Sequence, residues 1–127
     1  LCGTFPNACL RKYCSLPKNV AIMHETGLRI LIRKVQLAGT QYNKALFPIF
    51  SYSKEHYMRV FLRNDKGKNN ADNILALHGM LNDAGPMWLG QLWNHGLCNS
   101  MYKNSLKNET FNKNTELIKF LRIIKLM

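Results

Sequence analysis

The chain has 127 residues, of which 46% are hydrophobic, so it is long enough for one ordinary domain with its own core. No apolar run is long enough to cross a membrane as a helix. Lys and Arg number 18 against 7 Asp and Glu, which gives a formal net charge of +11. The first residues, Leu1-Cys-Gly-Thr, show neither an initiator methionine nor a signal pattern, so we expect a segment cut from a longer protein.

The positive charge is concentrated in the first half. Residues 1–63 hold ten basic and two acidic residues, whereas residues 64–127 hold eight and five. Such an excess favours a polyanionic partner, because phosphate contacts release counterions. The alternative is a lysine-rich protein whose surface is merely solvated. Nucleic acid is favoured because half of the basic residues in the first half are arginines: Arg11, Arg29, Arg33, Arg59 and Arg63.

The four cysteines do not form a disulfide scaffold in a domain of this size, so a reducing, intracellular environment is expected. Cys9 and Cys14 lie five residues apart, and no second pair has the spacing of a zinc ribbon. We therefore expect free thiols and no metal site.

The first 21 residues are predicted to form a bend, a short helix and a connector. Cys2–Pro6 is typical of a strand that leaves a sheet and turns, since Gly3 permits a sharp bend. Pro6 suits the first turn of a helix, and Asn7–Cys14 is predicted to be that helix, with basic residues near its end. Ser15–Ala21 is predicted to be a connector.

An amphipathic helix is predicted for His24–Ala38. Its apolar residues recur at helical spacing and form one stripe: Leu28, Leu31, Ile32, Val35 and Ala38. Gly39 is expected to end this helix, because glycine adopts the left-handed cap conformation without a Cβ clash.

Two β-strands are predicted next, at Ala45–Ser53 and His56–Arg63, separated only by Lys54–Glu55. Apolar and polar or aromatic residues alternate along the second run. A helix followed by a tight antiparallel pair is half of a larger layer, because its apolar faces need a sheet that the chain does not obviously supply.

The second half is less regular. Asn64–Asn73 is polar and contains glycine, so it is predicted to be a linker. Ile74–Leu81 is a short apolar run whose type stays open between strand and helix. Ala84–Trp93 packs two tryptophans between glycines, either as a buried plug or as an exposed stacking surface, and burial is favoured. Two further helices are predicted: Trp93–Asn108, and Thr115–Met127 with Asn114 as its cap.

No catalytic or phosphate-binding motif is present. The sequence contains no G-x-G-x-x-G or P-loop, no G-x-S-x-G elbow and no H-E-x-x-H. His24 and Glu25 are adjacent, so on a helix they point about 100° apart and do not form an acid/base pair. Composition and motifs alone therefore indicate a basic globular segment that faces RNA or DNA.

Four blocks, in this order, resemble those of the tRNA guanosine-26 N2-dimethyltransferase family and cover about residues 1–101: Leu1-Cys-Gly-Thr-Phe-Pro-Asn-Ala-Cys-Leu-Arg-Lys-Tyr, His24-Glu-Thr-Gly-Leu-Arg-Ile-Leu-Ile, Pro48-Ile-Phe-Ser-Tyr-Ser with His56-Tyr-Met-Arg-Val-Phe-Leu, and Gly85-Pro-Met-Trp-Leu-Gly. The resemblance implies an enzyme that dimethylates N2 of guanosine 26 in tRNA with S-adenosylmethionine. It also implies an intracellular location: the nucleus or mitochondrion in a eukaryote, and the cytoplasm otherwise.

The implied fold class is α/β, the C-terminal part of a class I, Rossmann-like methyltransferase sheet. On this reading Leu1–Gly3 trails the fifth strand, and the predicted strand pair is the terminal hairpin. The implied division is methyltransferase domain at 1–63, linker at 64–83, and a small α+β or mostly helical C-terminal domain fragment of tRNA-binding type at 84–127. Two other functions stay open: a non-catalytic basic RNA-binding module and a different class I RNA methyltransferase.

The resemblance also suggests site residues. The family's cofactor-binding glycine motif, ribose-binding acid and Asp-Pro-Phe motif all have no counterpart in this chain, so S-adenosylmethionine would be bound by residues upstream of Leu1. The rim of the base pocket is assigned to Cys2, Gly3, Thr4 and Pro6. The tRNA-binding residues are assigned to Arg11, Lys12, Lys18 and Arg29. For Arg29, a purely structural role is an equal alternative.

Two departures from the family pattern matter. The family often carries a zinc-binding cysteine cluster before the Gly85–Gly90 block, whereas Asn64–Asp83 contains no cysteine and is short. The prediction is therefore either no zinc or a zinc-binding segment that is missing from this sequence. After the block, Gln91 and Trp93-Asn94 stand where the family tends to have Pro and His-Asp.

Overall fold

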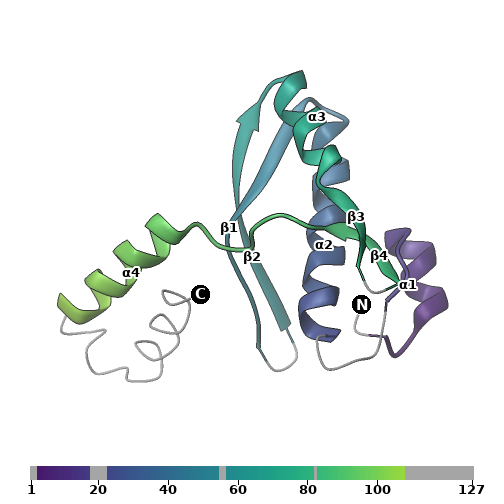
Figure 1. Ribbon diagram of the computed structural model, residues 1–127, viewed down its shortest axis with the longest axis horizontal. Coiled ribbons are helices and arrows are strands. Elements are labelled where there is room, and N and C mark those ends of the chain that lie inside the picture. The colour runs from purple at the N-terminus through teal and green to yellow at the C-terminus, as the bar shows by residue number, and fades with distance from the viewer. Residues whose placement is uncertain (1–2, 18–22, 55–56, 82, 108–127) are drawn as a thin grey trace. The chain divides into compact units, whose positions relative to one another are not determined.

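The computed structural model describes residues 3–17, 23–54, 57–81 and 83–107. Contacts divide the chain into two compact units, Leu1–Gln91 and Leu92–Met127. The first unit holds, in order, α1 (Pro6–Tyr13), α2 (Met23–Thr40), β1 (Lys44–Lys54), β2 (Tyr57–Lys66), α3 (Lys68–Ala76), β3 (His78–Leu81) and β4 (Ala84–Trp88) (Figure 1). In the second unit the described residues form α4 (His95–Lys107). The helix predicted for Thr115–Met127 lies outside the described residues.

Helix α2 confirms the predicted amphipathic helix but continues to Thr40. The prediction that Gly39 ends the helix is wrong. A Cβ on Gly39 would lie 3.0 Å from Leu46 Cδ1 and 3.1 Å from the Lys44 carbonyl oxygen. Glycine therefore allows the last helical turn to approach β1 closely, and the left-handed residue that follows is Asn43, with φ of 56°.

The predicted apolar stripe of α2 is only partly buried. Leu28 and Ile32 are in the core, but Val35 is 37% exposed and Ala38 is exposed. Ile30, which lies off that stripe, is fully buried. The reason is that α2 packs against β1 and also against β4. Side chains that face either strand are therefore buried, and the buried surface of the helix is wider than one stripe (Figure 1).

The predicted strand pair is confirmed as an antiparallel hairpin of β1 and β2, in which Ser51 pairs with Val60. Both strands run longer than predicted, and the register shifts between Pro48 and Phe50. Proline has no backbone N–H to donate to the ladder, so an irregularity beside it is expected.

The segment predicted to be a linker is structured. It holds the end of β2, all of α3 and β3, so the expectation of a loop at Asn64–Asn73 is wrong. Ala71 and Ile74, three residues apart, are 4% and 0% exposed and form the inner face of α3. The polar residues between them concealed this short amphipathic pattern. The run Ile74–Leu81, left open between helix and strand, contains the end of α3 and all of β3.

Strands β3 and β4 form a second antiparallel hairpin. Leu16 pairs with Gly85 through two backbone hydrogen bonds of 2.8 Å, so the connector after α1 lies along β4. Met87 and Trp88 are 0% and 3% exposed, which confirms the predicted burial of this run, whereas Leu89 is largely exposed. Cys9, Ile30, Ala84 and Met87 form a shared core cluster.

Helix α4 confirms the helix predicted over Trp93–Asn108. Asn94 caps its start, because the Leu97 N–H donates to Asn94 Oδ1 at 3.0 Å. Within the part of the chain that the structure describes, no helix is long and apolar enough to span a bilayer.

Candidate nucleic-acid interface

The predicted pocket rim is an exposed turn that leads into α1. Gly3 adopts φ of 100°, a conformation that glycine tolerates best. Thr4 is exposed, and Pro6 occupies the first helical turn, as predicted. Phe5 between them is 73% exposed. Cys2 lies outside the described residues, so its assignment to the rim stays a prediction.

Helix α1 presents its cations to solvent. Cys9 is buried and Tyr13, four residues later, packs against the same core cluster, so this face of α1 is turned inward. Arg11 and Lys12 occupy the last turn and are both exposed. Cations are favourable at that end, because the helix dipole is negative there. Lys18, the third predicted phosphate contact, lies outside the described residues.

The end of α1 is tied firmly to the rest of the first unit. Ser15 Oγ donates to the Pro86 carbonyl oxygen at 2.6 Å. Arg33 Nη1 lies 3.4 Å from the Tyr13 carbonyl oxygen and 3.4 Å from Ser15 Oγ. These contacts fix the direction in which the exposed cations of α1 project. The roles of Ser15 and Arg33 were not predictable from the sequence, because both depend on partners far away in the chain.

Arg29 is engaged within the fold. Its Nη1 donates to the carbonyl oxygens of Trp88 at 2.9 Å and Gly90 at 2.8 Å, and its Nε donates to Glu25 Oε1 at 3.0 Å. The Arg29 side chain is 16% exposed. These contacts support the structural alternative for Arg29: the residue joins α2 to the end of β4.

A buried polar pair joins α2 to β3 and β1. Gln36 is fully buried, and its Nε2 donates to the Leu46 carbonyl oxygen at 3.0 Å. Its Oε1 lies 2.7 Å from His78 Nε2, so that nitrogen carries the proton and donates. Burial, together with the nearby Arg33 guanidinium, lowers the pKa of His78 from 6.5 to about 4. His78 is therefore a neutral structural donor near pH 7, a role that sequence alone did not indicate.

The lowered pKa of His78 predicts an acid-dependent loss of stability. Because the unfolded state takes up the proton first, the free energy of unfolding should fall as pH drops from 6.5 towards 4. Denaturant unfolding across this range checks the prediction. The His78→Gln variant keeps a donor for Gln36 but does not titrate, so it should show a shallower decline. Equal pH dependence in both proteins would contradict the assignment.

The described residues do not fit an S-adenosylmethionine site. Among them, a strand leads to a helix at β2–α3, through Gly67, and at β4–α4, and neither of these links has the glycine-rich turn of a nucleotide-binding unit. Among the same residues, no three His, Cys, Asp or Glu side chains cluster as metal ligands. Cys9, Cys14 and Cys98 form no disulfide with one another.

Comparison with known proteins identifies the group to which this chain belongs. A family model of N2,N2-dimethylguanosine tRNA methyltransferases matches residues 1–83. The chain belongs to this family. The family inferred from the sequence blocks is thereby confirmed.

Two curated relatives cover 98% of the chain. One is the tRNA (guanine(26)-N(2)/guanine(27)-N(2))-dimethyltransferase of Aquifex aeolicus, at 30% identity, and the other is the tRNA (guanine(26)-N(2))-dimethyltransferase of Methanocaldococcus jannaschii, at 32%. Among solved structures, Trm1 from Pyrococcus horikoshii in complex with S-adenosyl-L-methionine matches 98% of the chain with a TM-score of 0.87 and 28% identity. The chain spans 39% of that structure, and 39% and 37% of the two relatives.

Proposed function

We propose that this chain is part of an enzyme that dimethylates N2 of guanosine 26 in tRNA with S-adenosylmethionine. The observation that carries the proposal is the match to Trm1 over 98% of the chain with a TM-score of 0.87. The net charge of +11 supports a tRNA partner. Since the described residues do not fit a cofactor site, we propose that the remainder of the enzyme binds S-adenosylmethionine and that residues 1–127 alone are inactive. An intracellular location is part of the proposal.

The β1–β2 hairpin and α2 support a place at the end of a class I methyltransferase sheet. Two antiparallel strands with a helix on one face leave outer edges that a larger sheet would pair. We therefore keep residues 1–63 as the end of the methyltransferase domain and 84–127 as the start of the C-terminal domain. Residues 64–83 join them as α3 and β3 rather than as a linker, and residues 84–91 pack within the first unit.

The proposed reaction needs positioning more than reactive groups. Guanine N2 is a weak nucleophile because its lone pair is delocalised into the ring, so the base must be held in line with the methyl group that S-adenosylmethionine supplies. A base inside a stack must leave it to enter such a pocket. In this chain, we propose that the turn at Gly3, Thr4 and Pro6, with Cys2, walls the pocket. Arg11, Lys12 and Lys18 would then hold nearby phosphates.

Removal of the α1 cations should weaken tRNA binding. For the complete enzyme, meaning these residues together with the cofactor-binding part, the Arg11→Ala/Lys12→Ala variant should lower tRNA affinity and reduce the slope of log K against log salt by about 2. Filter binding at several salt concentrations measures both. Lys34→Ala, an exposed cation on α2, is the matched control. An unchanged slope in the double variant would remove α1 from the interface.

Nucleoside mass spectrometry tests the proposed function. The complete enzyme, given tRNA and S-adenosylmethionine, should produce N2,N2-dimethylguanosine at position 26 and nothing on a tRNA with adenosine there. Binding of tRNA without methylation would favour the non-catalytic RNA-binding module. Methylation at another position would favour a different class I RNA methyltransferase.

A further inference from the structure

One face of β2 alternates aromatic and cationic side chains. Tyr57, Arg59, Phe61 and Arg63 are all exposed, whereas the intervening Met58, Val60 and Leu62 are half-buried. Tyr57 and Phe61 are 45% and 48% exposed. Two exposed aromatic residues four positions apart on a strand, with an arginine between them, are unusual for a face whose only contact is with solvent.

The opposite face of the hairpin is the one that α2 covers. Leu46 pairs with Asn64, which shares the face of Val60 and Leu62, and Leu46 contacts α2 at Gly39. Successive side chains of a strand point to opposite faces. The aromatic and cationic residues of β2 therefore point away from α2.

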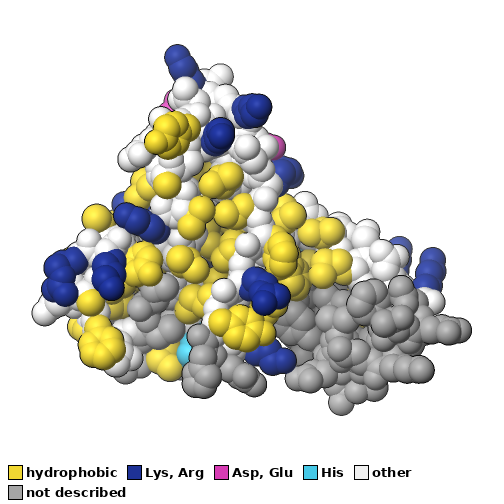
Figure 2. Space-filling view, turned by 180° about the vertical axis from the view of Figure 1, so that it is seen from behind, with side chains coloured by type: hydrophobic (Ala, Val, Ile, Leu, Met, Phe, Trp, Pro, Cys, Tyr) yellow, Lys and Arg dark blue, Asp and Glu magenta, His cyan; other side chains and the backbone are white. Residues whose placement is uncertain are grey.

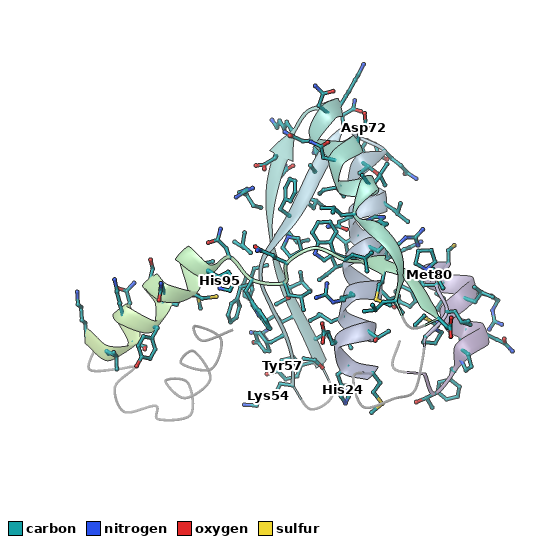
Figure 3. All side chains as sticks on the ribbon, in the orientation of Figure 1. His24, Lys54, Tyr57, Asp72, Met80 and His95 are labelled. Carbon is teal, nitrogen blue, oxygen red and sulfur yellow. The ribbon has the colours of Figure 1, made fainter. Side chains whose placement is uncertain are left out.

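Strand β1 extends this surface through its cross-strand partners. The exposed residues of β2 and their partners on β1, of which Phe47 and Tyr52 are half-buried and Phe50 is buried at 6% exposed, form what we call the aromatic–cationic ladder: Phe47, Phe50, Tyr52, Lys54, Tyr57, Arg59, Phe61 and Arg63. Neighbouring rings of the ladder are in contact. Ring centroids are 6.2 Å apart for Tyr57 and Tyr52, 5.7 Å for Tyr52 and Phe50, and 6.1 Å for Phe50 and Phe61. Lys54 and Tyr57 mark its end at the hairpin turn (Figure 3).

Two guanidinium groups lie over these rings. Arg59 Cζ is 5.5 Å from the centroid of Tyr57, and Arg63 Cζ is 5.4 Å from that of Phe47. Arg63 also pairs with Asp65 at 3.0 Å. Within the described residues, by contrast, Arg59 has no carboxylate or hydrogen-bond partner. A protein segment that buried this face would have to bring its own carboxylate or carbonyl oxygen to Arg59, because an uncompensated buried charge is strongly unfavourable.

The surrounding charge is positive. Residues 44–66 contain five cations and two carboxylates. On the face of the molecule drawn in Figure 2, Lys and Arg side chains lie among hydrophobic ones and few acidic groups are visible. A partner that offers flat rings for stacking and negative charge for the guanidiniums matches both properties, and single-stranded RNA offers both.

We infer that the aromatic–cationic ladder binds a single-stranded segment of RNA, with unpaired bases stacked on Tyr57 and Phe61 and a phosphate at Arg59. The inference rests on the proposed function and adds a second RNA-binding surface to it. From Tyr57 to Phe61 the strand rises about 13 Å, enough for two or three bases. Double-stranded RNA keeps its bases stacked and would gain little from these rings.

The test uses the complete enzyme and a labelled short RNA, either single-stranded or as a duplex of the same sequence. Tyr57→Ala should weaken binding of the single strand by about fivefold to about 150-fold, the range for loss of one stacked base. Binding of the duplex should change little. Tyr42→Ala is the matched control, because Tyr42 is an aromatic residue that is 74% exposed outside the ladder, and it should bind as the wild type does.

Variants of Arg59 separate charge from stacking. Arg59→Ala should lower affinity and reduce the salt slope by about 1, whereas Arg59→Lys should keep the slope and still bind more weakly. If Lys34→Ala lowered the affinity as much as Arg59→Ala does, the loss would reflect the general positive charge of the protein, and the inference would be overturned.

Two further results would overturn it. The first is wild-type affinity for the single strand in both Tyr57→Ala and Arg59→Ala. The second is a melting temperature of Tyr57→Ala or Arg59→Ala far below that of Tyr42→Ala, with RNA affinity intact. Such a result would show that protein covers this face. Methylation at position 26 separates the two proposals. If the enzyme methylates and the variants bind normally, only the ladder fails; if it does not methylate and the variants bind poorly, only the proposed function fails.

Discussion

Replacement of Gly90 by alanine is expected to destabilise the first unit by about 2–3 kcal/mol, because a Cβ at this position meets a buried ring. The added atom would lie 2.2 Å from Trp88 Cζ2 and 2.6 Å from Cε2. Trp88 is 3% exposed and its Nε1 donates to the Gln91 carbonyl oxygen at 3.0 Å, so the indole is held in place. Urea unfolding followed by tryptophan fluorescence measures the change.

A double-mutant cycle controls this prediction. Trp88→Phe removes part of the ring that the new Cβ would meet, so the Gly90→Ala change should be less destabilising in that background. Additive effects of the two substitutions would mean that the collision with Trp88 is not the cause. Wild-type stability of Gly90→Ala would contradict the packing itself.

Replacement of Arg29 by alanine should destabilise the first unit by about 3 kcal/mol, since it leaves the carbonyl oxygens of Trp88 and Gly90 without their charged donor. Arg29→Lys should lose much of the same stability, because a single ammonium does not reproduce the guanidinium geometry. Thermal and urea unfolding measure both variants.

Glu25→Gln is the matched control for Arg29. It weakens only the outer ion pair, in which the Glu25 side chain is 49% exposed, and should change stability by less than about 1 kcal/mol. If Arg29→Ala left stability unchanged but lowered tRNA affinity and its salt slope, Arg29 would be a phosphate contact and not a structural residue.

The local elements were largely predictable, because their signals are local. The spacing of Leu28 and Ile32 predicted α2, and the alternation around Val60 predicted β2. Pro6 marked the start of α1. The end of α2 was not predictable, since Gly39 is required by its contact with Leu46 rather than by helix termination. Helix α3 was missed because only Ala71 and Ile74 carry its apolar signal.

The candidate site was predictable in part. The exposure of Arg11 follows from its position on α1 opposite Cys9, whereas Lys12 lies three residues after Cys9, near the same face, so its exposure did not follow from helical spacing. The roles of Arg29 and Gln36 did not follow, because the carbonyl oxygens to which they donate lie 10 to 61 residues away in the chain. The aromatic–cationic ladder was visible only as alternation, and the register of β1 against β2 is what brings Tyr52 beside Tyr57 and Phe50 beside Phe61.

The most direct measurement of the central claim is the affinity for S-adenosylmethionine of residues 1–127 beside that of the complete enzyme. Isothermal titration should show one bound cofactor per complete enzyme and no binding to residues 1–127, whose folded state circular dichroism confirms in the same sample. Binding of S-adenosylmethionine to residues 1–127 with the affinity of the complete enzyme would contradict the account, and so would a complete enzyme that binds none.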